Sequence, residues 1–140
     1  MKITVETIVH STLEKTWKAW NTPEDIMQWN AASDDWHTPI SRVDLRPGGL
    51  FYSRMEAKDG SVGFDFEGTY TTVMDKQLIE YNMSDGRTVL VTFEEVEGGV
   101  KVTETFDADN EYPEEMQRQG WQSILERFKG YAEDITFFER

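Results

Sequence analysis

The chain has 140 residues, of which 38% are hydrophobic and 13% aromatic, a composition typical of one folded domain rather than of a disordered chain. The 27 acidic residues outnumber the 14 lysines and arginines, and the net charge of −13 disfavours binding to nucleic acid and to anionic membranes. The absence of cysteine excludes disulfides and thiol chemistry, and no stretch approaches the roughly 18 apolar residues of a membrane span, so we expect a cytoplasmic protein.

The N-terminal quarter predicts one strand and two short helices. Residues 2–10 alternate between apolar and polar side chains, which is typical of a strand. Ser11 or Thr12 can cap a first helix. Thr22 can cap a second one that begins at Pro23, because proline is favoured in a first helical turn. The buried sides of these helices are expected at their apolar residues, which are Leu13, Trp17, Trp20, Ile26, Met27 and Trp29.

Residues 30–39 have no periodic pattern, and we expect a loop that forms the rim or lid of a site. Trp36 and His37, together with Asp34 and Asp35, are candidates for a polar gate. Two histidines without cysteine do not make a metal site of normal spacing, so no metal is expected. No cofactor is expected either, because the chain contains no phosphate-binding loop or dinucleotide fingerprint.

Six segments with strand character follow, joined by short connections that carry turn residues. They span residues 40–45, 50–57, 62–73, 78–83, 88–96 and 100–107. Consecutive hairpins of this kind imply an antiparallel meander. The first strand is expected to close the sheet at one edge.

A last helix is predicted from Pro113 to about Asp134, capped by Asp109 or Asn110. It would be about 33 Å long, which is enough to cross a whole sheet. Gly120 lies in its middle, where glycine costs about 1 kcal/mol relative to alanine. We interpret it as a close approach of the helix to the sheet, the alternative being the close approach of a ligand. The apolar side of the helix is expected at Met116, Gly120, Trp121, Ile124, Leu125 and Phe128.

The order of strand, two short helices, six strands and long helix resembles the family named for activators of the heat-shock 90-kDa chaperone ATPase, homologue-1-like. That family belongs to the START-like, helix-grip (SRPBCC) superfamily, which includes the birch-pollen allergen. The similarity covers residues from about Ile3 to about Ala132. The matching pieces are Thr16-Trp17-Lys18-Ala19-Trp20, Thr22-Pro23-Glu24, Gln28-Trp29, Asp44-Leu45-Arg46-Pro47-Gly48-Gly49 with Phe51, Gly68 and Tyr70 before Leu78, and Gly120-Trp121 with Leu125 and Phe128.

The resemblance implies an α+β helix-grip fold over residues 1–140, with a curved antiparallel sheet wrapped around the long helix and a ligand cavity between them. Strand and helix phase then select the residues that would line this cavity. The alternative is that the same side chains pack together and leave no cavity. The candidate ligand-binding residues are Trp29, Trp36, His37, Phe51, Met55, Phe64, Phe66, Tyr70, Phe93, Glu104, Phe106, Met116, Gly120, Trp121 and Ile124.

Glu104 occupies a position where the family usually has an apolar residue, in phase with Val102 and Phe106. A carboxylate that points inward must be paired or protonated, and burial would raise its pKa. Two alternatives remain: a bulge that turns Glu104 outward, and a salt bridge to Arg54 or Arg87.

These observations favour a protein that binds a small apolar or amphipathic ligand, as a monomer or weak dimer. One alternative is a module that interacts with a chaperone or another protein through its acidic surface. The other is an enzyme of the cyclase or dehydratase type that uses an inward Glu104, with Tyr70 as a possible partner in acid–base chemistry.

Overall fold

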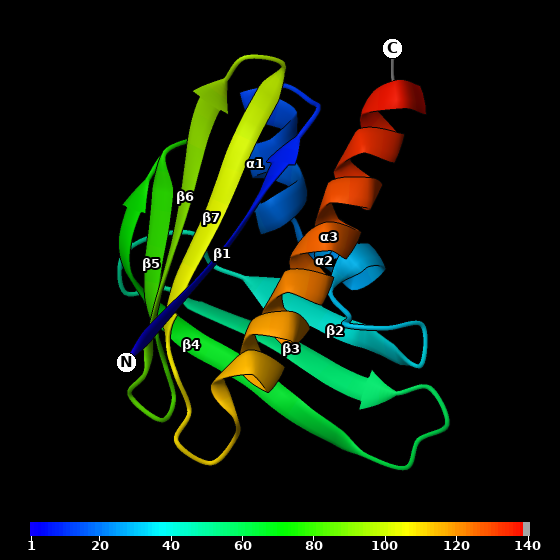
Figure 1. Cartoon of the computed structure of the whole chain (residues 1–140), viewed down its shortest axis with the longest axis vertical. Helices are drawn as coiled ribbons and strands as arrows, with labels where there is room; N and C mark the ends of the chain where they lie inside the picture. The colour runs from blue at the N-terminus through cyan, green and yellow to red at the C-terminus, as the bar shows by residue number, and fades with distance from the viewer. Residues whose placement is uncertain (139–140) are drawn as a thin grey trace.

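The computed structural model describes residues 1–138 as a seven-stranded antiparallel sheet that curls around a long C-terminal helix (Figure 1). The three helices are α1 (Leu13–Asn21), α2 (Pro23–Trp29) and α3 (Glu114–Phe138). The strands lie side by side in the order β1 (Lys2–Val9), β7 (Gly99–Asp107), β6 (Thr88–Val96), β5 (Leu78–Met83), β4 (Gly63–Met74), β3 (Leu50–Ala57) and β2 (Trp36–Val43). This arrangement confirms the predicted α+β helix-grip fold.

The strands from β2 to β7 form the expected meander, in which each strand pairs with the next. β1 then pairs with β7 without interruption, from Lys2 opposite Asp107 to Val9 opposite Val100, and so ends the sheet at one edge. The tight connections use glycine where the backbone needs a positive φ, as at Gly86 and Gly98. No helix within residues 1–138 has the length and apolar character needed to cross a lipid bilayer.

The largest departure from the expected elements is at β2, which begins at Trp36 and not after a loop that reaches residue 39. Trp36 and His37 therefore belong to a strand. Pro39 weakens the strand pattern of this segment, because proline has no N–H to donate to a neighbouring strand. β2 is the last strand of the sheet, and its register with β3 shifts between His37 and Ile40, so the missing donor is tolerated there.

The two short helices pack on each other and on α3 through aromatic rings. The Thr12 hydroxyl caps α1 by accepting from the Lys15 amide, as the sequence indicates. The indole N–H of Trp29 in α2 donates to the Ala19 carbonyl of α1 at 3.0 Å. Trp20 and Trp29 both meet Phe128 of α3 edge-on, with ring centroids 4.8 and 4.9 Å apart.

α3 crosses the concave side of the sheet and buries a stripe that contains Leu125, Phe128 and Ala132 (Figure 1). Two expectations for this helix are wrong. Met116 is 60% exposed, because it lies five residues before Trp121 and so about 140° around the helix from it. Gly120 does not mark a close approach to the sheet, because a Cβ atom added there meets nothing within 4 Å.

Candidate functional site

A cavity of about 290 Å³ lies between the concave face of the sheet and the three helices. Its volume is at the lower end of that of small-molecule sites, which run from roughly 300 to 1,000 Å³. The interior of the domain is therefore not completely filled by side chains. The walls of the cavity are largely aromatic and aliphatic. The apolar lining consists of Trp20, Ile26 and Trp29 from α1 and α2, Val43, Phe51, Met55, Phe64, Phe66, Ile79 and Met83 from the strands, and Trp121 and Ile124 from α3.

The structure brings nine of the fifteen candidate residues together around this cavity. Strand alternation placed the members of β3 and β4 on the correct face, and helix spacing did the same for Trp121 and Ile124 of α3. That these residues contact a ligand stays a prediction. The nine are Trp29, Phe51, Met55, Phe64, Phe66, Tyr70, Glu104, Trp121 and Ile124.

Four of the remaining candidates lie in the core or at the rim. Phe93 is buried against Trp17, with ring centroids 5.0 Å apart. Phe106 is fully buried. Trp36 packs against Phe64 at the end of β4, with centroids 5.9 Å apart. His37 faces Glu56 of β3, with 3.8 Å between its Nε2 atom and a carboxylate oxygen. Met116 and Gly120, described above, also lie outside the lining.

The expected polar gate does not form around His37. Asp34 is instead 91% exposed and accepts a hydrogen bond from Arg127 of α3 at 2.8 Å. The guanidinium group of Arg127 holds the pKa of the Asp34 carboxyl below its usual range. The loop before β2 is thus tied to α3 rather than to His37.

Sequence reasoning missed several lining residues. Ile79, Tyr81 and Met83 alternate along β5, and this period of two was a usable signal for one shared face. Ser53 was not among the missed residues, because strand phase placed it on the same face of β3 as Phe51 and Met55. Trp20 and Asn21 reach the cavity from the end of α1, which depends on how the helices dock and is not visible in a local pattern.

Glu104 points inward and is only 5% exposed. It sits between Val5 of β1 and Val91 of β6 in the register of the sheet. Within residues 1–138 its carboxyl group makes no hydrogen bond or ion pair with another side chain. Burial raises the pKa of Glu104 to about 8, so the group holds its proton at neutral pH.

Neither alternative for Glu104 is observed. β7 pairs regularly with both neighbours at this position, so no bulge turns the side chain outward. Arg54 binds Glu56 and Asp65 on the outer face of the sheet. Arg87 binds Asp85. The inward orientation of Glu104 is therefore confirmed.

Further polar side chains face the cavity without a partner in the described part of the chain. The hydroxyl groups of Ser53, Tyr70 and Tyr81 make no hydrogen bond there, and the Oδ1 atom of Asn21 is buried and unpaired. Burial raises the pKa of Tyr81, and the nearby Glu104 and Tyr70 add to the effect. Burial likewise raises the pKa of Tyr70. The cavity thus combines apolar walls with a few polar groups that the protein leaves unsatisfied.

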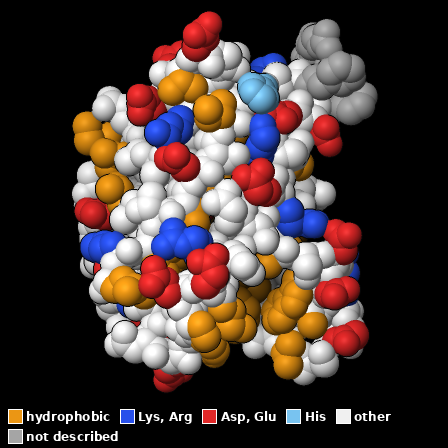
Figure 2. All heavy atoms as spheres, viewed as in Figure 1, with side chains coloured by type: hydrophobic (Ala, Val, Ile, Leu, Met, Phe, Trp, Pro, Cys, Tyr) orange, Lys and Arg blue, Asp and Glu red, His pale blue; other side chains and the backbone are white. Residues whose placement is uncertain are grey.

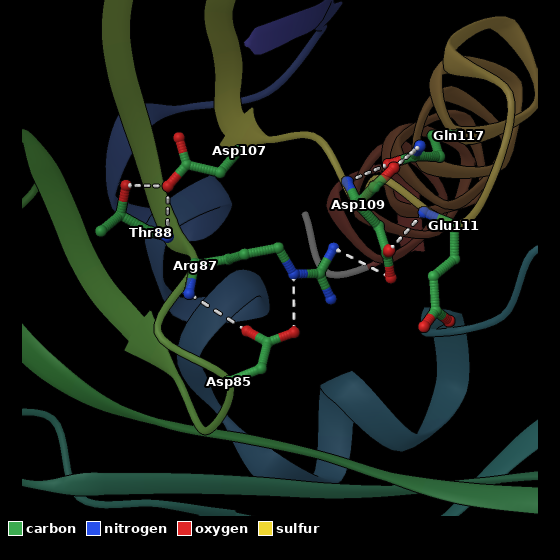
Figure 3. Close-up of polar contacts among 7 residues, drawn as sticks. All are labelled: Asp85, Arg87, Thr88, Asp107, Asp109, Glu111 and Gln117. Atoms are coloured by element: carbon green, nitrogen blue, oxygen red, sulfur yellow. Dashed lines mark hydrogen bonds and ion pairs between the residues drawn. The ribbon is translucent and has the colours of Figure 1, made fainter.

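Arg87, in the turn between β5 and β6, also lines the cavity, and Figure 3 shows its polar contacts. Its Nε atom donates to Asp85 at 2.7 Å, and its Nη1 atom lies 3.7 Å from the carboxylate of Asp109. The side chain of Gln117 in α3 accepts from the Asp109 amide at 2.8 Å and donates to the Asp109 carbonyl at 2.7 Å. This network connects the turn to the start of α3.

The cavity reaches the surface near Phe64, which lines it and is 47% exposed. Figure 2 shows apolar side chains gathered low on this face, over the first turns of α3 and the strands that pass beneath it.

Comparisons with known proteins agree with this fold. The family model described as "Activator of Hsp90 ATPase homolog 1-like protein" matches residues 10–133. A solution structure of an AHSA1-like protein from Aeromonas hydrophila is 50% identical, with a TM-score of 0.90, covering 96% of this chain and 93% of that one. No curated protein matches the chain.

Two further solved structures are similar. A protein from Cytophaga hutchinsonii is 47% identical, with a TM-score of 0.83, covering 95% of this chain and 92% of that chain. A protein from Nitrosomonas europaea is 20% identical, with a TM-score of 0.84, covering 96% of this chain and 95% of that chain, and this likeness concerns the fold alone.

Proposed function

The chain belongs to the family of proteins similar to activator of Hsp90 ATPase homologue 1, and on this premise we propose that it binds a small apolar or amphipathic molecule in the cavity between its sheet and α3. The observation that carries the proposal is the cavity itself. Small domains usually pack their interiors to crystal-like density, so an unfilled space of about 290 Å³ favours a binding role for the cavity. Apolar walls with a few polar groups are what a small-molecule site requires.

The cavity lies on rigid elements. Three tryptophans line it, namely Trp20, Trp29 and Trp121, and each belongs to a helix. A ligand that entered would bury its apolar surface against these rings and the strands below, at roughly 25 cal/mol per Å² of apolar area. The unpartnered polar groups would then orient its polar end.

The proposal is tested by amide NMR during titration with pooled lipids, aromatic metabolites and polyketide-like compounds. We expect saturable shifts at Phe66, Tyr81, Trp121 and Ile124. The matched variants are Ser53→Leu, which fills the cavity, and Ser123→Leu on the outer surface of α3. Loss of the shifts in the first variant alone supports the site, whereas shifts that survive Ser53→Leu, or no shifts at all, contradict it.

A second candidate is acid–base catalysis in the same cavity. The observation in its favour is the buried position of Glu104 near Tyr81 in the cavity lining. Burial raises the pKa of Glu104 to about 8, and a carboxyl with a pKa near neutrality is suited to proton transfer. Incubation of a bound compound with the protein, followed by mass spectrometry, tests it. Conversion that is lost in Glu104→Gln supports catalysis, and recovery of the unchanged compound leaves binding as the function.

We further infer a cytoplasmic location, which the lack of cysteine favours. Interaction with a chaperone stays a prediction supported by the acidic surface, with a net charge of −13. Such an interaction predicts that the affinity of the complex falls as the salt concentration is raised, because ions screen the attraction between charged surfaces.

A further inference from the structure

We propose that the ligand is an organic cation, an apolar or aromatic body with one basic nitrogen, and that Glu104 pairs with its ammonium group. The inference rests on the proposed function and specifies the ligand class of that cavity. It comes from the position of one carboxyl group in a largely apolar wall.

Glu104 is the acidic side chain among the residues that line the cavity. It is 5% exposed and flanked in the sheet by Val5 and Val91. Among residues 1–138 no donor binds its carboxyl group. Because a buried carboxyl without a partner destabilises the fold, a bound group that donates to it would remove that penalty.

The rings around the cavity favour a cation over an anion. Trp20, Trp29, Phe66, Tyr81 and Trp121 all present aromatic surface to the same space. The faces of such rings attract ammonium groups through their quadrupole. The net charge of −13 also raises the local concentration of cations around the protein.

Two arginines line the cavity, Arg42 and Arg87, and the guanidinium group of Arg42 lies over the ring of Tyr52, 5.8 Å from the ring centroid. Arg87 lies in the turn between β5 and β6. It is occupied by Asp85 and lies beside Asp109. It therefore neither neutralises Glu104 nor offers a free site for an anion.

Tyr81 of β5 lies close enough to Glu104 for the two groups to interact electrostatically, and Tyr70 of β4 lies close to Tyr81 in the same lining. In the register of the sheet, β1 and β6 place Val5 and Val91 beside Glu104. The residues of α3 that line the cavity, Trp121 and Ile124, are uncharged.

The pairing predicts that binding is coupled to release of a proton. In the free protein, burial raises the pKa of Glu104 to about 8, so the group is mostly protonated at pH 7. An amine with a pKa near 10, like that of lysine, stays charged over this range. The Glu104 carboxyl must give up its proton to pair with it, so affinity should rise up to about tenfold per pH unit below pH 8.

The probes are 4-phenylbutylamine, 4-phenylbutan-1-ol and 4-phenylbutyrate, which share one apolar body and carry a cationic, a neutral and an anionic end. Calorimetry at pH 6, 7 and 8, in two buffers of different ionisation enthalpy, measures affinity and proton release. Glu104→Gln keeps the shape of the neutral side chain. Glu94→Gln is the matched control, because it makes the same charge change at an exposed position of β6.

We expect the amine to bind at least tenfold more tightly than the alcohol at pH 8, with a smaller preference at pH 6. This preference should vanish in Glu104→Gln and persist in Glu94→Gln. Equal binding of amine and alcohol, or a preference that survives Glu104→Gln, overturns the inference but leaves the proposed function standing. Tightest binding of 4-phenylbutyrate overturns it in the same way. Binding of none of the three at millimolar concentration counts against the proposed function itself, and the inference falls with it.

Discussion

The indole ring of Trp121 is stacked on the ring of Phe106, with centroids 3.9 Å apart and ring planes inclined by 11°. Trp121 belongs to α3, whereas Phe106 belongs to β7 and lies two residues beyond Glu104 on the same face of the strand. The stack therefore holds α3 over the sheet next to the buried carboxyl group. Because Trp121 also lines the cavity, the contact that anchors the helix forms part of the candidate site.

Trp121→Ala should lower the free energy of unfolding by about 3 kcal/mol, since a large ring is removed from a well-packed contact. Urea denaturation monitored by circular dichroism measures the change. Met116→Ala is the control in the same helix, and because Met116 is 60% exposed its effect should stay within about 0.5 kcal/mol. Similar losses in the two variants would show that the stack does not anchor α3.

Glu104 should make the protein less stable as the pH rises from about 5 to about 8. The folded state keeps the proton up to a pKa of about 8, whereas an unfolded glutamate releases it near the ordinary value of 4.5. The folded state therefore binds more protons in this window, and the free energy of unfolding should fall by up to about 1.4 kcal/mol per pH unit. Denaturant titrations at pH 5, 6, 7 and 8 measure the slope.

Glu104→Gln tests the origin of this slope, because glutamine does not titrate. The variant should match the original protein near pH 5 and exceed it in stability near pH 8. Glu94→Gln should keep the original slope. If Glu104→Gln leaves the slope unchanged, another group causes it.

Asp107 should stabilise the fold above about pH 4 and lose this effect as the pH falls towards 2. Lys2, at 2.7 Å, and Thr88, through its amide and hydroxyl groups, lower the pKa of the Asp107 carboxyl to about 2. A lowered folded-state pKa means that the unfolded chain takes up the proton first on acidification. Asp107→Asn should cost about 1 kcal/mol at pH 7, since the group is partly exposed, and little at pH 2.

The control for Asp107→Asn is Asp75→Asn, and acid-induced unfolding is measured for both variants. Asp75 is 77% exposed and binds its neighbour Lys76, so its replacement should leave the acid transition in place. A transition that shifts equally in both variants would assign the effect to net charge rather than to the contacts of Asp107.

Gly120→Ala should raise the free energy of unfolding by about 0.5–1 kcal/mol. A Cβ atom at Gly120 meets nothing within 4 Å, and alanine is the better helix former. Gly68→Ala should destabilise instead, because its Cβ atom would collide with the Asn82 carbonyl and approach the Phe51 ring to 2.8 Å. Thermal melts compare the two. Destabilisation by Gly120→Ala would indicate that the helix does need the bare position.

Gln117→Ala should loosen the connection between β7 and α3. Its side chain binds the amide and carbonyl of Asp109 (Figure 3). It also donates to the Tyr112 carbonyl at 2.9 Å. We expect a loss of about 1–2 kcal/mol and faster amide exchange over residues 109–117. Gln119→Ala, at an exposed position two residues later, should leave exchange there unchanged. Equal exchange in both variants would contradict this role of Gln117.

Local patterns in the chain predicted the elements well, because they depend on near neighbours. β3, β5 and β6 begin and end where alternation and turn residues indicate, and α2 begins at Pro23. The same alternation placed Glu104 in phase with Val102 and Phe106, so its inward direction followed from the period of two along β7. The turn at Gly98 likewise follows from a residue that tolerates positive φ.

Tertiary structure alone decided whether those directions create a site. Pro39 is tolerated within β2 because that strand lies at the edge of the sheet. The order of the strands in the sheet cannot be predicted from the local sequence around Pro39. Met116 and Gly120 lie off the buried stripe because the docking of α3 on Phe106 selects which face is covered. The cavity and the unpaired state of Glu104 arise where segments far apart in the chain converge. The sequence by itself therefore determined which way each side chain points along its own element, while long-range packing determined what it meets there.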